Sequence, residues 1–138
     1  MIAIAIAEGH IFSILNGNQP FLDMIPGGLW PGNAPRETQG LYCIYDFLGA
    51  SDEEAFNNVR VAVDVLYRIK IVGRTHDILD LEPAATAMDN LIHRSQSFYQ
   101  GHRIAACVRT APYNLTETID DVDWRYLGGD YRLYIQES

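Results

Sequence analysis

Positive charge is scarce in this chain. The sequence has 10 Lys and Arg against 18 Asp and Glu, so its formal net charge is −8 at pH 7. A surface of this sign repels nucleic-acid phosphates, which argues against a protein that coats DNA. It remains compatible with DNA that slides past an acidic wall, because repulsion prevents sticking.

Cysteines and long hydrophobic runs are also few. The two cysteines, Cys43 and Cys107, lie in predicted strands. We expect them to be small buried residues of a reducing compartment, and a disulfide between neighbouring strands is the open alternative. No stretch approaches the roughly 20 apolar residues of a membrane span, so we expect no membrane partner. The apolar start, Met1 to Ala7, is too short for the core of a secretory signal.

Familiar catalytic and metal-binding motifs are missing as well. The four histidines, at positions 10, 76, 93 and 102, do not pair at a metal-ligand spacing. There is no Gly-x-Ser-x-Gly elbow and no phosphate-binding glycine loop. We therefore expect no catalytic residue, no metal and no cofactor, and a protein that is not an enzyme.

The chain does contain one long alternating segment, Val59 to Val72. Its apolar side chains fall on one parity, namely Val59, Val61, Val63, Val65, Tyr67, Ile69 and Ile71. This pattern predicts one strand with an apolar face, about 45 Å long at roughly 3.3 Å per residue. Strands of compact domains usually have about 5–6 residues. A longer strand bends or projects, and its unpaired edges favour pairing with another chain. The first inference from the sequence is therefore assembly.

The remaining segments predict an α+β fold in a single domain, residues 1–138. Apolar stripes predict helices over 3–15 and 81–92, with a short helical turn at 21–25. Strands are expected at 41–48, at 103–110 where Pro112 would end the strand, and in extended segments 115–123 and 124–136. Residues 29–36 read as irregular and 49–58 as a polar connection. The expected sheet is mainly antiparallel, with one long strand or hairpin packed by two helices.

The C-terminal segments contain two adjacent glycines and a group of four carboxylates. Gly128 and Gly129 predict a bulge or tight bend. The carboxylates are Glu117, Asp120, Asp121 and Asp123. They fit a solvated hairpin tip, a site for acid–base or cation chemistry, or an acidic rim that faces DNA in an assembly.

Aromatic and basic residues supply the candidate subunit interface. Tyr67, Trp124 and Tyr126 suit both half-buried sheet faces and interfaces, where a ring buries area and keeps its polar group paired. Arg68 and Lys70 lie at the outer end of the long strand. These five residues are the expected interface.

The order of these segments resembles a known family. The carrying features are the long strand 61–72, the helix that ends Met88-Asp89-Asn90-Leu91-Ile92-His93-Arg94, the strand that ends Cys107-Val108-Arg109-Thr110-Ala111-Pro112, and the tract from Glu117 to Ile135 with its Gly128-Gly129-Asp130. The pattern, with a Pro/Gly segment at 30–35 before the strand at 41–48, resembles the tail completion or tail terminator proteins of long-tailed bacteriophages and prophages.

The resemblance implies a virion structural protein of the tail or neck, assembled in the host cytoplasm. It implies a ring, typically a hexamer, that caps the tail tube, ends tail polymerisation and joins the tail to the head connector. The implied partners are other copies of the chain, the tail tube protein, the connector or stopper protein, and genomic DNA that passes through the bore without specific binding. The acidic residues 117, 120, 121 and 123 would then face the bore.

Two alternatives stay open. The first is another virion station, either a head–tail joining or stopper protein or a tube-like subunit. The second is a small ligand-binding or enzymatic α+β domain with a site near the Glu117–Asp123 acidic cluster.

Overall fold

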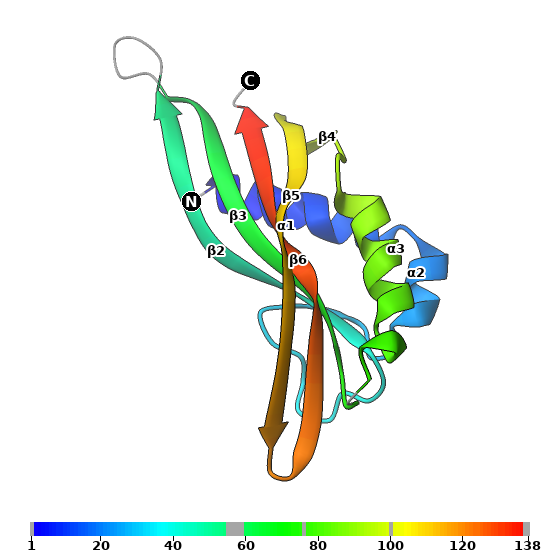
Figure 1. Ribbon diagram of the computed structural model, residues 1–138. Coiled ribbons are helices and arrows are strands. Elements are labelled where there is room, and N and C mark those ends of the chain that lie inside the picture. Colours follow the sequence, from blue (N-terminus) through cyan, green and yellow to red (C-terminus); the bar gives the residue numbers. More distant parts are fainter. Residues whose placement is uncertain (1, 55–59, 76, 100, 137–138) are drawn as a thin grey trace.

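The computed structural model describes residues 2–54, 60–75, 77–99 and 101–136. The described elements follow in chain order: α1 (Ile2–Asn16), α2 (Gln19–Met24), β1 (Leu29–Pro31), β2 (Tyr42–Glu54), β3 (Arg60–Gly73), the 3-10 helix η2 (Ile78–Asp80), α3 (Glu82–Ile92), β4 (Ser97–Tyr99), β5 (His102–Ile119) and β6 (Val122–Gln136). Figure 1 shows the long strands as one curled sheet with the helices gathered beside it.

The sheet has six strands in the order β1-β2-β3-β6-β5-β4. Only the short β1 pairs in parallel, with β2, and the other four pairings are antiparallel. The predicted α+β class and mainly antiparallel sheet are confirmed, although the sheet is mixed. The helices α1 and α3 pack against the sheet, and α2 is a third helix that packs on these two. None of the described helices is long and apolar enough to cross a bilayer.

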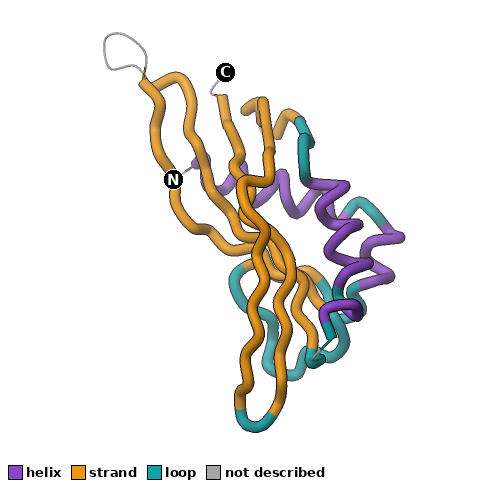
Figure 2. The backbone as a smooth tube through the Cα atoms, viewed as in Figure 1, coloured by secondary structure: helices purple, strands orange, loops and turns teal. Residues whose placement is uncertain are grey.

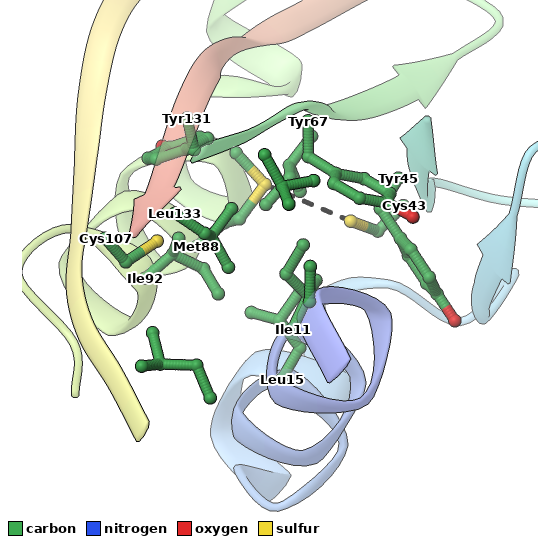
Figure 3. Close-up of a cluster of buried hydrophobic side chains, with 14 of the residues drawn as sticks. Ile11, Leu15, Cys43, Tyr45, Tyr67, Met88, Ile92, Cys107, Tyr131 and Leu133 are labelled. Atoms are coloured by element: carbon green, nitrogen blue, oxygen red, sulfur yellow. Dashed lines mark hydrogen bonds between the residues drawn. The ribbon is translucent and has the colours of Figure 1, made fainter. Parts of the chain in front are cut away.

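The core lies between the helices and one face of the sheet. The predicted apolar parity of the long strand is confirmed, because Val63, Val65, Tyr67, Ile69 and Ile71 are at most 1 % exposed. Tyr131, Leu133 and Ile135 of β6 pair with this row and share its face. The helices supply the opposing layer, in which Ile11, Leu15, Met88 and Ile92 are fully buried (Figure 3). Cys43 of β2 and Cys107 of β5 are buried in this core and free, as expected, with the Cys43 thiol beside the Met88 sulfur at 3.9 Å.

Several predicted strand bounds were wrong. The segment 29–36, predicted to be irregular, contains β1, and the division predicted between residues 123 and 124 lies instead at the turn of residues 120 and 121. The strand predicted to stop at Leu48 continues to Glu54, because residues 49–54 pair with β3 across a bulge near Leu48. The rest of the predicted polar connection, 55–58, lies outside the described residues. The strand predicted to stop before Pro112 runs to Ile119. β4 pairs only with His102–Ile104, so Pro112 lies where β5 is an edge strand and no partner needs its missing N–H.

The two glycines of β6 also differ from expectation. Pairing of β6 with β3 runs without interruption through Gly128 and Gly129, so neither is a bulge. The irregularity lies on the other neighbour, β5, between Arg109 and Ala111. The strands approach closely at Gly128, where a Cβ would overlap the main-chain oxygen of Ile69.

The β5–β6 hairpin extends beyond the rest of the sheet. We name residues 113–126 the arm. The last β3 residue to pair with β6 is Gly73, opposite Arg125, so residues 117–124 form a ribbon of only two strands. No helix lies beside the end of the arm (Figure 2). An isolated two-stranded hairpin is marginally stable in water, so this ribbon is an element that a neighbouring molecule would stabilise.

Candidate assembly surfaces

All three α-helices cover one face of the sheet, and we name the opposite face the helix-free face. Its charged residues pair across neighbouring strands. Arg68 binds Asp130 with N···O 2.9 Å, and Lys70 lies 3.3 Å from Asp46. Arg132 binds Asp64 through two contacts of 2.7 and 2.8 Å. The register of the strands therefore neutralises these charges within the subunit.

Four of the five predicted interface residues belong to this helix-free face, but Tyr67 does not. Arg68 and Lys70 have the parity opposite to the buried row of β3, and Tyr126 and Trp124 continue the corresponding row of β6. The Tyr67 ring is fully buried on the helix side, 5.9 Å from the ring of Phe47. The structure thus brings four of these residues together and places the fifth inside the core of its own subunit.

An aromatic and cationic cluster joins the arm to the body on the helix-free face. The Arg68 guanidinium lies 4.0 Å from the centre of the Tyr113 ring, and the Lys70 ammonium lies 5.2 Å from that of Tyr126. The Arg74 guanidinium lies 4.8 Å from the centre of the Trp124 ring. Such contacts contribute roughly 0.5–2 kcal/mol each, so the base of the arm is held to β3.

Two of these aromatic residues have further partners. The Trp124 ring meets the Tyr42 ring edge-on, with centroids 6.5 Å apart. The Tyr126 hydroxyl donates to Glu117 across a longer 3.4 Å contact. Burial, and then the nearby carboxylate of Glu117, raise the pKa of Tyr126 to about 12, so the phenol stays a neutral donor near pH 7.

Two members of this cluster, Tyr113 and Arg74, were not predicted from the sequence. Their positions depend on the β5–β6 and β3–β6 registers, which bring Tyr113 opposite Gly128 and Gly128 opposite Lys70. Alternation shows which residues share a face of one strand, but it does not show which strand lies beside it.

The apolar side of β6 changes along the strand. In the body, the odd-numbered residues Tyr131, Leu133 and Ile135 are buried against the helices, and Asp130 and Arg132 lie on the helix-free face. In the arm, the odd-numbered positions are polar and the even-numbered ones are Val122, Trp124 and Tyr126. Leu115 and Ile119 of β5 pair with Tyr126 and Val122, so they share this side. The arm therefore presents an apolar row on the helix-free face.

The acidic residues lie at the tip of the arm, which agrees with the predicted hairpin tip. Asp120 and Asp121 are the two turn residues between Ile119 and Val122. Glu117 pairs with Trp124 and lies on the helix-free face, whereas Asp123 pairs with Thr118 on the other face and accepts its hydroxyl at 2.6 Å. The four carboxylates therefore do not converge on one point. No cluster of metal-ligating side chains occurs in residues 2–54, 60–75, 77–99 and 101–136, and His76 is outside these ranges.

A groove of about 460 Å³ lies between the segment 34–38 and the apolar row of the arm. Ile119, Val122 and Trp124 line its arm side. Arg36 and Arg74 lie at its other walls, and Asp120 is the carboxylate at its rim. With one carboxylate and mainly apolar or aromatic walls, this groove suits contact with another protein surface better than acid–base chemistry.

The turn of the arm is strained, which gives a test of its geometry. Asp120 and Asp121 both have positive φ, 51° and 63°, as in the two-residue turns of hairpins that favour Asn-Gly. We expect the double variant Asp120→Asn, Asp121→Gly to raise the free energy of unfolding by about 1 kcal/mol, because Gly has no Cβ to strain in this conformation. Urea denaturation measures the change. The matched control is Asp120→Asn, Asp121→Asn, which removes the same charges but keeps a Cβ at both positions, and an equal gain in that control would contradict a conformational cause.

Comparison with known proteins finds a shared fold. No protein-family model matches the chain, and no curated protein sequence matches it. One chain of a solved structure described as the virion of a native gene transfer agent particle has the same fold, with a TM-score of 0.68 and 11 % sequence identity over 91 % of each chain. At this identity the likeness shows the fold of this α+β chain, over nearly its whole length, and leaves its function to be inferred.

Proposed function

We propose that this chain is a virion structural protein that forms a ring, caps the tail tube, ends tail polymerisation and joins the tail to the head connector. The observation that carries the proposal is the fold shared over 91 % of both chains with a chain of a gene transfer agent virion. Coverage of both chains at this level means that the shared fold extends over most of the length of each chain. The order of elements in the sequence independently resembles the tail terminator family.

The projecting strands support a role in assembly. β3, β5 and β6 have 14, 18 and 15 residues, well beyond the usual length of about 5–6. The two-stranded end of the arm has apolar residues on its surface, and Ile119 is 48 % exposed. A lone subunit leaves this ribbon without a supporting layer, whereas a ring of copies supplies one.

The charge of the chain supports a bore through which DNA passes. The formal net charge is −8, and the tip of the arm places Asp120 and Asp121 in solvent. In the proposed ring the end of the arm projects into the bore, so that Glu117, Asp120, Asp121 and Asp123, on both of its faces and at its turn, repel the phosphates of the genome and DNA moves without adhering. Arg68, Lys70, Trp124 and Tyr126 border the contact between neighbouring copies, and Tyr67 supports them from inside the core.

A second station in the virion is the main alternative. A head–tail joining or stopper protein, or a tube-like subunit, would share the virion location and the capacity to assemble. We place the protein at the end of the tail because the order of its segments resembles that of tail terminator proteins. The ligand-binding or enzymatic alternative is not favoured, since Glu117 and Asp123 lie on opposite faces of the arm.

Loss of the gene in the particle-producing host distinguishes these stations. Without a terminator, tube polymerisation has no stop, so we expect overlong tails of variable length and separate filled heads. Loss of a stopper would leave tails of normal length without heads, and loss of a tube subunit would leave no tails. Electron microscopy of lysates measures tail length, and the wild-type gene supplied in trans is the control. Normal-length or absent tails would refute the terminator assignment.

A further inference from the structure

Among the described residues, the subunit's own chain bonds the outer edge of β5 as far as Arg109 and not beyond it. Gln96 donates its side-chain amide to the carbonyl of Ala105 at 3.0 Å, and the Arg94 N–H donates to the carbonyl of Cys107 at 2.6 Å. The Arg109 N–H donates to His93 Nδ1 at 3.1 Å. These described bonds cover the edge in a regular series, and the series ends where the arm begins.

The edge beyond that point has the character of a strand-pairing site. A two-residue turn closes on a hydrogen-bonded pair, here Ile119 and Val122, so alternate residues back along β5 turn their main-chain groups to the open edge. These residues are Thr118, Thr116 and Asn114. Residues 110–119 contain no Lys or Arg, the side chains that most often protect an exposed edge, and one proline, Pro112.

The other long strand with an open side is β2, at the opposite side of the same sheet. β1 pairs only with Cys43, Ile44 and Tyr45 of β2, so no described strand covers residues 46–51 on that side. Phe47 and Leu48 lie in this stretch and are 44 % and 40 % exposed. On the arm, Leu115 and Ile119 are 38 % and 48 % exposed. Each open edge therefore has apolar side chains that a paired strand would cover.

Strand directions make these two edges compatible. Three successive antiparallel pairings connect β2 to β5, so the two strands run in opposite directions within a subunit. A second copy placed edge to edge in the same orientation sets its β2 antiparallel to β5. Antiparallel ladders are slightly more stable per residue than parallel ones. The contact joins two different surfaces of one chain, which is the head-to-tail kind that closes into rings.

The register across the sheet predicts a stagger between copies. Asp46 lies level with Ala111 through Arg68 and Asp130, so the open part of β2 is level with the covered part of β5. Pairing residues 46–51 with the arm shifts the neighbour along the strands by about seven residues, roughly 23 Å at 3.3 Å per residue. A stagger repeated around a closed sheet is the feature that tilts the strands of a barrel.

We propose that the open edge of β5 in the arm, residues 113–119, pairs antiparallel with the open edge of β2, residues 46–51, of a second copy of this chain. This inference rests on the proposed ring and specifies its contact. The arm is then the element that each subunit inserts beside its neighbour, and pairing supplies the support that the two-stranded ribbon lacks.

Thr116 is the position at which to test the pairing. Arg68 and Lys70 are tied to Asp130 and Asp46 within the subunit, so charge reversal there would disturb the fold. Thr116 is exposed, and its N–H is one of those turned to the open edge. Thr116→Pro removes that N–H, whereas Thr116→Val removes the side-chain hydroxyl and keeps the N–H. Native mass spectrometry of the full-length protein over rising concentration measures assembly, and thermal melting of the monomer checks the fold.

We expect wild type and Thr116→Val to form one discrete oligomer, and Thr116→Pro to assemble at least ten-fold more weakly with an unchanged monomer melt. Hydrogen exchange of the wild type gives a readout without mutation, in which the amides of 114, 116 and 118, and those amides of 46–51 that are not bonded to β3, become protected in the oligomer. Rings with unprotected arm amides would overturn this pairing alone. A wild-type protein that stays monomeric, or stops at a two-fold dimer, would overturn the head-to-tail pairing and the ring in solution, while the tail-length experiment still tests the station in the virion.

Discussion

Replacing Gly128 with alanine is expected to lower the free energy of unfolding by about 3 kcal/mol or more. A Cβ at this position would overlap the Ile69 main-chain oxygen and lie 2.6 Å from the Lys70 Cα. Both are backbone atoms of β3, the central strand, so relief requires β3 and β6 to separate. Their separation would disturb the core row from Val63 to Ile71 and the position of Tyr113 above Arg68. Urea denaturation followed by circular dichroism measures the loss.

Gly49→Ala is the matched control for this variant. Gly49 also lies in a long strand, but an added Cβ there meets nothing within 4 Å. Alanine has less backbone freedom than glycine in the unfolded chain, so this change should be neutral or stabilise by up to about 1 kcal/mol. Equal denaturation midpoints for the two variants would contradict the close approach of β3 and β6 at Gly128.

Acid is expected to destabilise the protein through His10, a residue of α1 that is 1 % exposed. Its Nε2 lies 2.9 Å from the Ser95 hydroxyl and its Nδ1 lies 2.7 Å from the Ser97 hydroxyl. Because Ser95 gives its hydroxyl proton to the Ile92 carbonyl, Nε2 is the donor to Ser95 and Nδ1 accepts from Ser97. The imidazole is thus neutral and fully bonded, linking α1 to the segment before β5.

Burial lowers the pKa of His10 from its usual value of 6.5 to about 4. Between these two values the unfolded chain binds a proton that the folded protein does not, so the free energy of unfolding falls as pH falls from 6.5 towards 4. The expected loss is on the order of 3 kcal/mol, at 1.36 kcal/mol for each pKa unit. Stability curves in urea at half-unit pH steps measure it.

His10→Asn separates this effect from the titration of carboxylates. The amide keeps one hydrogen-bond donor and one acceptor but does not ionise in this range. We expect the variant to be less stable at pH 7 and to have a flatter profile between pH 6.5 and 4. Parallel profiles for the two proteins would show that His10 does not control the acid response.

Alternation and helical stripes predicted the helices and the buried faces of the long strands, but not where the strands end. The single parity of Val63, Val65, Tyr67, Ile69 and Ile71 predicted which face of β3 is buried, since successive side chains of any strand point to opposite sides. The stripe through Ala84, Met88 and Ile92 predicted the buried side of α3 in the same way. The acidic residues that fit a hairpin tip are found there, because a two-residue turn exposes its side chains.

Pairing between distant strands was beyond such patterns. Pro112 reads as a strand end in isolation, and it is harmless within β5 because, among the described residues, no strand pairs with the outer side of β5 beyond Ile104. Gly128 and Gly129 read as a bulge, and only the close approach of β3 explains why glycine is needed at Gly128. The prediction of the interface residues failed at Tyr67 for the same reason. Tyr67 is adjacent to Arg68 in sequence but lies on the opposite face of the sheet.

The amino-acid order thus determined the helices, the long strands and their buried rows, all of which depend on residues near one another in the chain. The tertiary structure decided which strands are neighbours, where the chain's own bonds to β5 stop, and on which side the arm places Leu115, Ile119 and Val122. The physical reason is that strand pairing uses main-chain groups that every residue has. The side-chain pattern restricts the face of a strand but leaves its partner and register to the packing of the whole chain.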